Sequence, residues 1–318
     1  MEKRNTQNYI KKIAEAGSIS VAAEQLGISQ PALSAYLKKV ENELDAVLFD
    51  RNRQPLELTE AGVVYMEYLE KQSVLQKELT QNLADIESLD TGDVTVGGAS
   101  FFNIAYLPGA VAKFASDYPG VNIEIIDGKV PELVTTAQKG NLDLFITPVA
   151  DEPDRFCYEE LLKEKIFLAV PEDWEINEII KDKAVNAAGG LPKSGNFEDV
   201  PLLNAEEFSA LCRNTFIVLK ADQDLGRRME SLFEKFGCRP ARVITAEQTM
   251  TTLNLTQNGV GVSMITESSI RNCGLAKLPM LYMIDPEMCT RKMYIAYPRN
   301  RYISRAAKKF ITALKESN

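Results

Sequence analysis

Residues 18–41 read SISVAAEQLGISQPALSAYLKKVE and contain two short helical patterns that are joined by Gly27. The second pattern opens with Ser-Gln-Pro. Ser29 is a favourable N-cap there, and Pro31 is tolerated because the first turn of a helix leaves its N–H groups unpaired. Apolar residues then recur at three- and four-residue spacing, which places them on one face of a helix. The pattern predicts a helix over about residues 30–44, with an inner face of Leu33, Leu37, Val40 and Leu44.

The opposite face of this predicted helix is small and polar near its start and basic in its middle. At about 100° per residue it comprises Pro31, Ser34, Ala35, Lys38 and Asn42. A helix of this kind can lie in the major groove of DNA and contact base edges with its N-terminal residues. Ordinary amphipathic surface helices have the same periodicity, so the pattern alone leaves both interpretations open.

The flanking segments complete a helix-turn-helix with a following wing. Residues 4–16 carry a helical apolar stripe that Gly17 ends, and Ser18 caps a short second helix. After the third helix, residues 47–49 are apolar and expected to be buried. Residues 50–55 are predicted to form a polar turn, and residues 56–58 alternate as a short strand.

The composition of the whole chain indicates a globular protein. Its 318 residues are 45% hydrophobic and 25% charged, which is enough for two or three domains with sizeable cores. No apolar run is long enough to span a bilayer, and the first ten residues have no apolar signal-peptide region. We therefore expect a soluble cytoplasmic protein without a membrane partner.

The cysteine and histidine content excludes several kinds of site. The five cysteines are scattered and form no CxxC motif, so reduced thiols are expected rather than a disulfide framework or a zinc site. The chain has no histidine, which removes Ser-His-Asp and Cys-His chemistry and histidine-ligated metals. No metal and no cofactor are predicted. Cys212 remains open as either a redox sensor or an idle buried thiol.

The net charge of −9 limits any affinity for DNA. Residues 1–60 contain 8 basic and 9 acidic residues, so the segment predicted to contact DNA is close to neutral. Phosphate binding then depends on a few placed cations, hydroxyls and helix N-termini, and each monomer should bind weakly. The residues predicted to contact double-stranded DNA are Ser18, Ser29, Gln30, Pro31, Ser34, Lys38, Lys39, Arg51 and Arg53.

Some sixty N-terminal residues closely resemble the DNA-binding domain of the LysR-type transcriptional regulators. The matching positions are Ala14, Gly17-Ser18, Ala22-Ala23-Glu24-Gln25-Leu26, Ser29-Gln30-Pro31-Ala32-Leu33-Ser34, Glu43-Leu44, Leu48-Phe49, Arg51 and Leu58-Thr59-Glu60-Ala61-Gly62. This family commonly has arginine where this chain has Ala35, and a polar residue where it has Tyr36. The missing cation is expected to weaken a phosphate or guanine contact, or to change the bases that are read.

A long helical pattern follows over residues 63–91, which we predict to be a linker and dimerisation helix. Six of eight positions with a/d-type spacing are apolar or aromatic, as in a coiled-coil seam. These positions are Tyr65, Gln72, Leu79 and Ile86 in one series, and Tyr68, Leu75, Asn82 and Leu89 in the other. A helix packed on its own domain is the alternative. Weak monomer binding favours a dimer, and the resemblance implies a homodimer or homotetramer through this helix and the effector domains.

From residue 92 strand and helix patterns alternate, which predicts an α/β fold with largely parallel sheets. The order of elements and the segment NGVGVSMI at residues 258–265 resemble the two-lobed, periplasmic-binding-protein-like effector domain of the same family. The fold class is therefore predicted as a winged helix-turn-helix over residues 1–62, the linker helix, and an α/β effector domain. Residues 92–165 and 285–318 form its first lobe and residues 166–284 its second. Residues 171–215 are the least readable part.

A small effector is expected between the lobes, where strands end and helix N-termini offer unpaired N–H groups. Hydroxyls and N–H groups in this position suit a carboxylate or another small anion. The candidate ligand-binding residues are Ala99, Ser100, Phe101, Thr147, Gln223, Leu225, Gln248 and Thr266. Ser100 could equally cap its own helix, and Gln248 could be a capping-box partner or face solvent.

These observations predict a DNA-binding transcriptional regulator that is controlled by a small, anionic effector. One alternative is a regulator whose C-terminal domain serves only assembly or thiol redox sensing. An enzyme with a Rossmann-like core is less favoured, because the chain has no GxSxG, P-loop or SxxK motif and no histidine.

Overall fold

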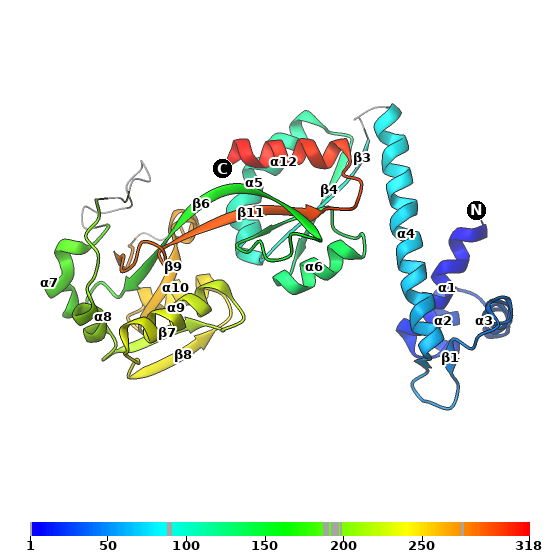
Figure 1. Cartoon of the computed structure of the whole chain (residues 1–318), viewed down its shortest axis with the longest axis horizontal. Coiled ribbons are helices and arrows are strands. Elements are labelled where there is room, and N and C mark those ends of the chain that lie inside the picture. Colours follow the sequence, from blue (N-terminus) through cyan, green and yellow to red (C-terminus); the bar gives the residue numbers. More distant parts are fainter. Residues whose placement is uncertain (1, 88–90, 187–190, 192–196, 198, 275–276) are drawn as a thin grey trace. The chain divides into compact units, whose positions relative to one another are not determined.

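The computed structural model describes residues 2–87, 91–186, 191, 197, 199–274 and 277–318. It divides into two compact units, residues 1–83 and residues 84–318, which we describe separately (Figure 1). Leu89 of the predicted seam and part of the segment 171–215 lie outside the described residues. Within the described chain, no helix is long and apolar enough to cross a membrane.

The first unit is a helix-turn-helix with a short two-stranded wing and a long following helix (Figure 1). Its core includes Ile10, Ile13, Leu33, Leu37 and Phe49, which are all almost completely buried. The elements are α1 (Glu2–Ala16), α2 (Ile19–Leu26), α3 (Gln30–Leu44), β1 (Phe49–Asp50), β2 (Glu57–Leu58) and α4 (Glu60–Glu87).

Two apolar residues that were expected to be inside this unit are exposed instead. Leu44 is 44% exposed because α3 ends there and the chain reverses at Asp45, which has a positive φ of 49°. Glu41 takes the buried place one turn earlier on the helix. Val47 is 58% exposed, whereas its neighbours in the predicted apolar run are buried as expected.

Two glycines of the family-like motif allow the wing to approach the helices closely. Gly17 has a φ of +59°, and a Cβ built there would lie 2.8 Å from the Cβ of Pro55. The backbone N–H of Leu56 donates to the carbonyl oxygen of Gly17 at 2.8 Å. A Cβ at Gly62 would lie 2.1 Å from the carbonyl oxygen of Leu48. Only glycine fits these contacts without a backbone shift, which explains both positions in physical terms.

The second unit contains one nine-stranded mixed sheet in the order β4-β3-β5-β11-β6-β9-β7-β8, with β10 pairing with β6. Its strands are β3 (Gly92–Gly98), β4 (Val121–Asp127), β5 (Leu144–Thr147), β6 (Phe156–Val170), β7 (Thr215–Leu219), β8 (Arg242–Ala246), β9 (Val262–Thr266), β10 (Met280–Tyr282) and β11 (Thr290–Pro298). Its other helices are α5 (Ser100–Asp117), α6 (Val130–Gln138), α7 (Ile176–Ile180), the 3-10 helix η1 (Lys181–Lys183), α8 (Ala205–Leu211), α9 (Asp224–Phe236), α10 (Thr249–Gln257), α11 (Glu267–Asn272) and α12 (Arg305–Ser317).

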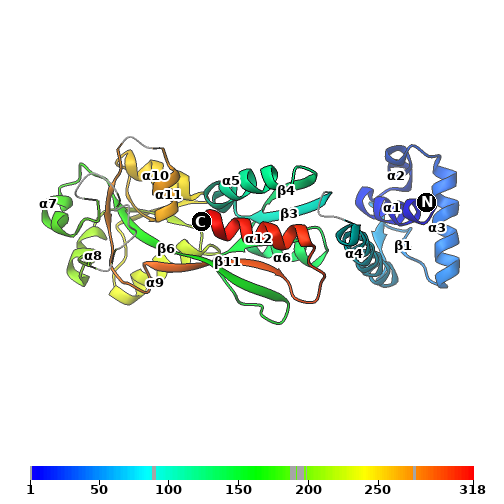
Figure 2. The same ribbon diagram turned by 90° about the horizontal axis from the view of Figure 1, so that it is seen from above.

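Two long antiparallel strands, β6 and β11, join two lobes within this sheet (Figures 1 and 2). Lobe 1 contains β3, β4 and β5 with α5, α6 and α12, and lobe 2 contains β7 to β10 with α7 to α11. β6 pairs with β11 up to Lys165 and with β9 from Ile166 onward. Separate apolar cores lie in the two lobes. The register thus places residues 164–166 and 290–291 at the junction of the lobes.

The alternation of strands and helices that the sequence predicts from residue 92 is present in the second unit. The sequence patterns missed β10 and α11, which are three and six residues long and too short to show a period. In the segment 171–215, which was the least readable part of the sequence, the described residues contain α7, η1 and α8.

Candidate DNA interface and lobe junction

The leading turn of α3 presents two polar side chains that bind each other. The Nε2 of Gln30 donates to the Oγ of Ser34 at 2.9 Å, and the pair lies on the solvent side of the helix. Ala35 is exposed beside them. Tyr36 turns inward and makes an edge-to-face contact with Tyr9, with ring centroids 5.3 Å apart. Tyr36 therefore packs on the core of the unit and does not extend the exposed polar surface.

A serine side chain caps the N-terminus of each of the two helices of the helix-turn-helix, α2 and α3. Ser18 caps α2 by accepting from the N–H of Val21 at 3.4 Å, and Ser29 caps α3 by accepting from the N–H of Ala32 at 3.4 Å. Pro31 occupies the first turn of α3, as predicted. The cap hydroxyls already accept one bond each, so their first role is to fix the helix starts.

Basic groups of the first unit differ in how they are paired. Arg51 binds the buried Glu41 at 2.9 Å, and Arg53 binds the exposed Glu57 at 2.8 Å. Lys39 lies 3.9 Å from Glu43. Lys38 makes no ion pair with any residue that the structure describes. Among these cations, Lys38 is therefore the one that a phosphate can bind without breaking an existing ion pair.

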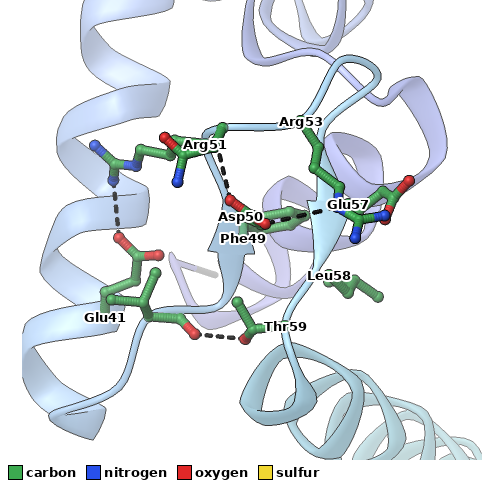
Figure 3. A pocket seen from close by; sticks show the side chains of 10 residues that line it. Glu41, Phe49, Asp50, Arg51, Arg53, Glu57, Leu58 and Thr59 are labelled. Carbon is green, nitrogen blue, oxygen red and sulfur yellow. Dashed lines mark hydrogen bonds and ion pairs between the residues drawn. The ribbon is translucent and has the colours of Figure 1, made fainter.

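A hollow of about 480 Å³ lies between α3 and the wing (Figure 3). Glu41 lines this hollow and also accepts from the backbone N–H of Leu48 at 2.9 Å. Thr59 closes the other side by donating to the carbonyl oxygen of Val47 at 2.6 Å. These bonds fix the wing to α3, and the ion pair with Glu41 holds Arg51 beside that helix.

α4 carries a row of exposed apolar side chains within the first unit. Val64, Tyr68, Leu75, Leu79 and Leu83 are each more than half exposed. Tyr68, Leu75 and Leu79 belong to the predicted coiled-coil positions, whereas the side chain of Ile86 is outside the described set. The side chain of Asn82 donates to the carbonyl oxygen of Glu78 at 2.8 Å. Such a row on a long helix is typical of a surface that a partner covers.

At the junction of the lobes, Glu164 of β6 and Arg291 of β11 form a buried ion pair. They are register partners on the two crossing strands, and their side chains are 2% and 3% exposed. The Nε and Nη2 of Arg291 lie 2.7 and 2.6 Å from Oε2 of Glu164. The other oxygen of Glu164 accepts from the N–H and the hydroxyl of Ser268 at the start of α11. We name these three residues, together with Asp224, the junction cluster.

Asp224 connects the junction cluster to α9, which begins at this residue. Its Oδ2 lies 3.3 Å from Nη1 of Arg291, and its carboxylate also accepts two bonds of 3.1 Å from Nε of Arg228. Arg228 in turn donates to the carbonyl oxygens of Met288 and Thr290 at 3.0 and 3.2 Å. The network ties the start of α9 to the segment that leads into β11.

Lobe 1 reaches the same cluster through α5. The guanidinium of Arg291 lies 5.2 Å from the ring centroid of Phe102. The hydroxyl of Tyr106 donates to the Oγ of Ser268 at 3.3 Å, which is a direct hydrogen bond between the lobes. A second bond between the lobes is an exposed ion pair of 2.9 Å between Lys129 and Asp222. The beginnings of α5, α9 and α11 therefore meet at one buried pair of charges.

Electrostatics keep the buried pair charged. Burial favours the neutral carboxyl, but Arg291 and Ser268 bind the carboxylate and lower the pKa of Glu164 overall. Burial likewise opposes the charge on Arg291, and the neighbouring Glu164 and Asp224 raise its pKa. Burial raises the pKa of Tyr106, so its hydroxyl stays protonated and donates.

Three of the predicted ligand-binding residues, Thr266, Gln223 and Gln248, are N-cap residues of helices in lobe 2. Thr266 lies beside the junction cluster, where it caps α11 and its hydroxyl is within 3.0 Å of the Oγ atoms of Ser268 and Ser269. Gln223 is the N-cap residue of α9, and its Nε2 donates to the carbonyl oxygen of Glu247 at 3.0 Å. Gln248, the residue after Glu247, is exposed and is the N-cap residue of α10.

In the described part of the chain, the side chains of the remaining predicted ligand-binding residues make no hydrogen bond to the junction cluster. Ala99, not Ser100, is the N-cap residue of α5, so the alternative of Ser100 as the cap is wrong; β3 extends to Gly98 and α5 begins at Ser100 itself. Phe101 and Leu225 are buried in the cores of their lobes. Thr147 is buried, and its hydroxyl and the backbone of Val149 bind each other at 3.2 Å.

The junction cluster itself was missed by the sequence patterns, apart from the neighbouring Thr266 and Leu225. Glu164 and Arg291 sit in strands that also carry exposed charged residues, and Glu164 is 127 residues from its partner. Only the antiparallel register of β6 and β11 brings the two together. In β11 the buried Arg291 and Met293 alternate with Lys292 and Tyr294, so the inward direction of Arg291 had a signal in the sequence, but its partner had none.

Comparison with known protein families matches both units. Residues 5–63 match the model of the bacterial regulatory helix-turn-helix protein, lysR family, and residues 87–318 match the LysR substrate binding domain. The chain is 28% identical over 321 residues to the Bacillus subtilis transcriptional regulator YcgK, covering 97% of this chain and 93% of that protein. It is 24% identical over 307 residues to YybE of the same organism, covering 95% and 94%. Both relatives are themselves uncharacterised.

Solved structures share the fold along the whole chain. A full-length OxyR variant from Pseudomonas aeruginosa superposes with a TM-score of 0.68 at 17% identity, covering 99% of this chain and 95% of that one. CbnR in complex with its target DNA gives a TM-score of 0.65 at 18% identity, covering both chains completely. The predicted fold class is thus confirmed. The chain belongs to the LysR family of DNA-binding transcriptional regulators, with a helix-turn-helix and a substrate-binding effector domain, and its relatives are regulators rather than enzymes.

Proposed function

We propose that this regulator reads double-stranded DNA as a homodimer, through the leading turn of α3, and that a small anionic effector controls it from the lobe junction. The observation that carries the first part is the exposed Gln30–Ser34 pair at the start of α3, with the cation of Lys38 one turn further along. N-terminal residues of a recognition helix contact base edges, and a following cation contacts the backbone.

The homodimer is supported by the exposed apolar row on α4. A single helix-turn-helix with near-neutral charge makes few phosphate contacts, whereas a dimer doubles them and presents two recognition helices to two half-sites. A second copy of α4 is the partner that buries Tyr68, Leu75 and Leu79 by the heptad spacing of the sequence. Association of dimers into tetramers is compatible with the same proposal.

Substitution of Gln30 or Ser34 by alanine should reduce discrimination between operator bases by about 1–3 kcal/mol, because either change removes a base-edge contact. The two side chains bind each other at 2.9 Å, so the double variant should lose less than the sum of the single losses. The measurement is the affinity for an operator selected from a random library and for its single-base variants. Glu24→Ala, at an exposed site of α2, serves as the control. A uniform loss on all sequences would instead assign these residues to phosphates.

The effector part rests on the meeting of three helix starts at the junction cluster. Helix N-termini favour anions, and Arg291 already holds two carboxylates there. We propose that the effector is a small carboxylate bound beside the starts of α5 and α9 at this junction and beside the start of α10, because Gln223 donates to the carbonyl oxygen of Glu247 just before α10. Its polar contacts would be Ser100, Gln223 and Gln248. The division into lobes 92–165 with 285–318 and 166–284 belongs to this proposal.

Small carboxylates should raise the thermal midpoint of the full-length protein, because a ligand that binds only the folded state stabilises it, by about 2.7 kcal/mol at 100 times its Kd. The measurement is a thermal-shift screen against a panel of such anions at constant ionic strength. Ser100→Ala should lower the affinity of any carboxylate that shifts the midpoint, and Ser231→Ala on α9 should not. If no anion shifts the midpoint, the effector domain serves assembly or another signal.

A further inference from the structure

Two cysteines of lobe 2 lie in direct contact, although 26 residues separate them. The Sγ of Cys212 is 2.9 Å from the Sγ of Cys238. Cys212 is the C-cap residue of α8 and is buried, whereas Cys238 follows Gly237 at the end of α9 and is half-buried. Both pack against the core of lobe 2. Cys212 thus lies inside the lobe, whereas Cys238 lies partly at its surface.

The backbone fixes both cysteines from several sides. The N–H of Ala241 donates to the carbonyl oxygen of Cys212 at 2.8 Å, and the N–H of Cys212 donates to that of Phe208 at 3.0 Å. The N–H of Cys238 donates to the carbonyl oxygen of Phe233 at 3.1 Å. A disulfide needs its sulfur atoms about 2.0 Å apart, so bond formation asks for a movement of only about 0.9 Å. This lies within the reach of side-chain rotation, without any unfolding of the lobe.

We propose that Cys212 and Cys238 are a reversible dithiol–disulfide site in the effector domain. A zinc site is the other use of neighbouring thiols, but it needs about four ligands. Among the residues that the structure describes, no group of three or more cysteine and acidic side chains could hold a metal. Two thiols alone suit the formation of a disulfide. The site is separate from the junction cluster, which lies at the opposite end of α9, where Asp224 begins the helix.

The reaction with a hydroperoxide balances in two steps. The more exposed sulfur, that of Cys238, attacks one oxygen of hydrogen peroxide as a thiolate; the O–O bond breaks, water leaves after protonation, and Cys238 becomes a sulfenic acid. The sulfur of Cys212 then attacks that of Cys238, forming the S–S bond and breaking the S–O bond. A second water leaves with the proton of Cys212. Two thiols lose two electrons, and one peroxide is reduced to two waters.

The roles of the two cysteines follow from their surroundings. Burial, with the neighbouring Cys238, raises the pKa of the Cys212 thiol, so Cys212 is a poor first nucleophile. Its direct contact with the sulfur of Cys238 assigns it the resolving step. Cys238 is followed by Arg239, but that guanidinium binds Glu230 at 2.7 Å. The greater exposure of the residue therefore distinguishes Cys238 from its partner.

The test uses the reduced full-length protein, treated with stoichiometric hydrogen peroxide, alkylated and digested for mass spectrometry. The expected product is a peptide pair linked through Cys212 and Cys238, lighter by two hydrogens and separated again by dithiothreitol. In Cys212→Ala, dimedone should label Cys238 as the trapped sulfenic acid. Cys273→Ser is the matched control, because Cys273 is also half-buried but donates to the carbonyl oxygen of Ile270 instead. It should leave the linked pair unchanged.

Stability of the unsubstituted protein gives a second readout that no variant can confound. A disulfide that closes a 26-residue separation should raise the thermal midpoint of the oxidised protein, and reduction should restore the original value. The proposal is overturned if both thiols stay open to alkylation after peroxide treatment. It is equally overturned if Cys238 pairs with Cys157, Cys273 or Cys289 as often as with Cys212.

Discussion

Arg291→Met is expected to lower the free energy of unfolding of the effector domain by about 3–5 kcal/mol, because it leaves the carboxylate of Glu164 buried without its counter-ion. Glu164 is only 2% exposed and has no route to solvent without opening the lobe junction. The substitution also removes the cation from the face of Phe102. Urea unfolding can follow the loss through Trp174, the only tryptophan of the chain, which packs against the core of lobe 2.

Lys292→Met is the matched control for this substitution. Lys292 is the next residue on β11, but it is half-exposed and binds the exposed Glu160 at 2.7 Å. An exposed ion pair contributes about 0–1 kcal/mol, so this variant should remain close to the parent protein. Adding Glu164→Gln to Arg291→Met should recover much of the loss, since the amide oxygen still accepts from Ser268, the buried charge of Glu164 is gone, and Asp224 keeps its pair with Arg228. Equal losses for the two single methionine variants would contradict the role of the buried pair.

A rise in salt from 50 to 200 mM should weaken operator binding by the dimer by about 10³-fold or more, as expected for six or more phosphate contacts. Because the charge of residues 1–60 is near neutral, we expect these contacts to come from placed groups, chiefly Lys38 and the wing arginines. Lys38→Ala should reduce the slope of log K against log[salt] by about 0.9 for each phosphate that the lysine no longer neutralises, and so by about 1.8 for a dimer. Fluorescence anisotropy with a labelled operator measures the slope.

Two comparisons sharpen this experiment. Lys163→Ala removes the same charge from an exposed site of β6 in the effector domain and should leave the slope unchanged. Arg51→Ala should change the slope less than Lys38→Ala, because Arg51 is already paired with Glu41. A salt slope near zero for the parent protein would rule out recognition through the phosphate backbone.

The first unit was readable from the sequence because its determinants are local. Caps, turn glycines and a helical apolar period all act within a few residues, and α3 has the predicted bounds. The errors fall where tertiary contacts override the period. Leu44 lies past the point where the chain reverses, and Glu41 is buried because Leu48 and Arg51 satisfy its carboxylate.

The lobe junction was only partly readable for the opposite reason. Rules for helix starts led to Gln223 and Thr266, which do lie close to Asp224 and Ser268. The charges that these helix starts surround come from strands far apart in the chain. Likewise, the contact between Cys212 and Cys238 depends on how α8 docks beside the end of α9. Neither pairing has a sequence period, so neither was predictable without the register and packing of the elements.

The crossing of the chain at β6 and β11 has a consequence for the order in which the protein matures on the ribosome. The elements of the helix-turn-helix are contiguous, so this unit is complete once about the first quarter of the chain has emerged. Lobe 1 must wait for β11 and α12, the last segments to be synthesised, because Phe310 and Leu314 complete its core. Translation that stops before residue 290 therefore yields a complete DNA-binding unit attached to an effector domain in which lobe 1 lacks part of its core.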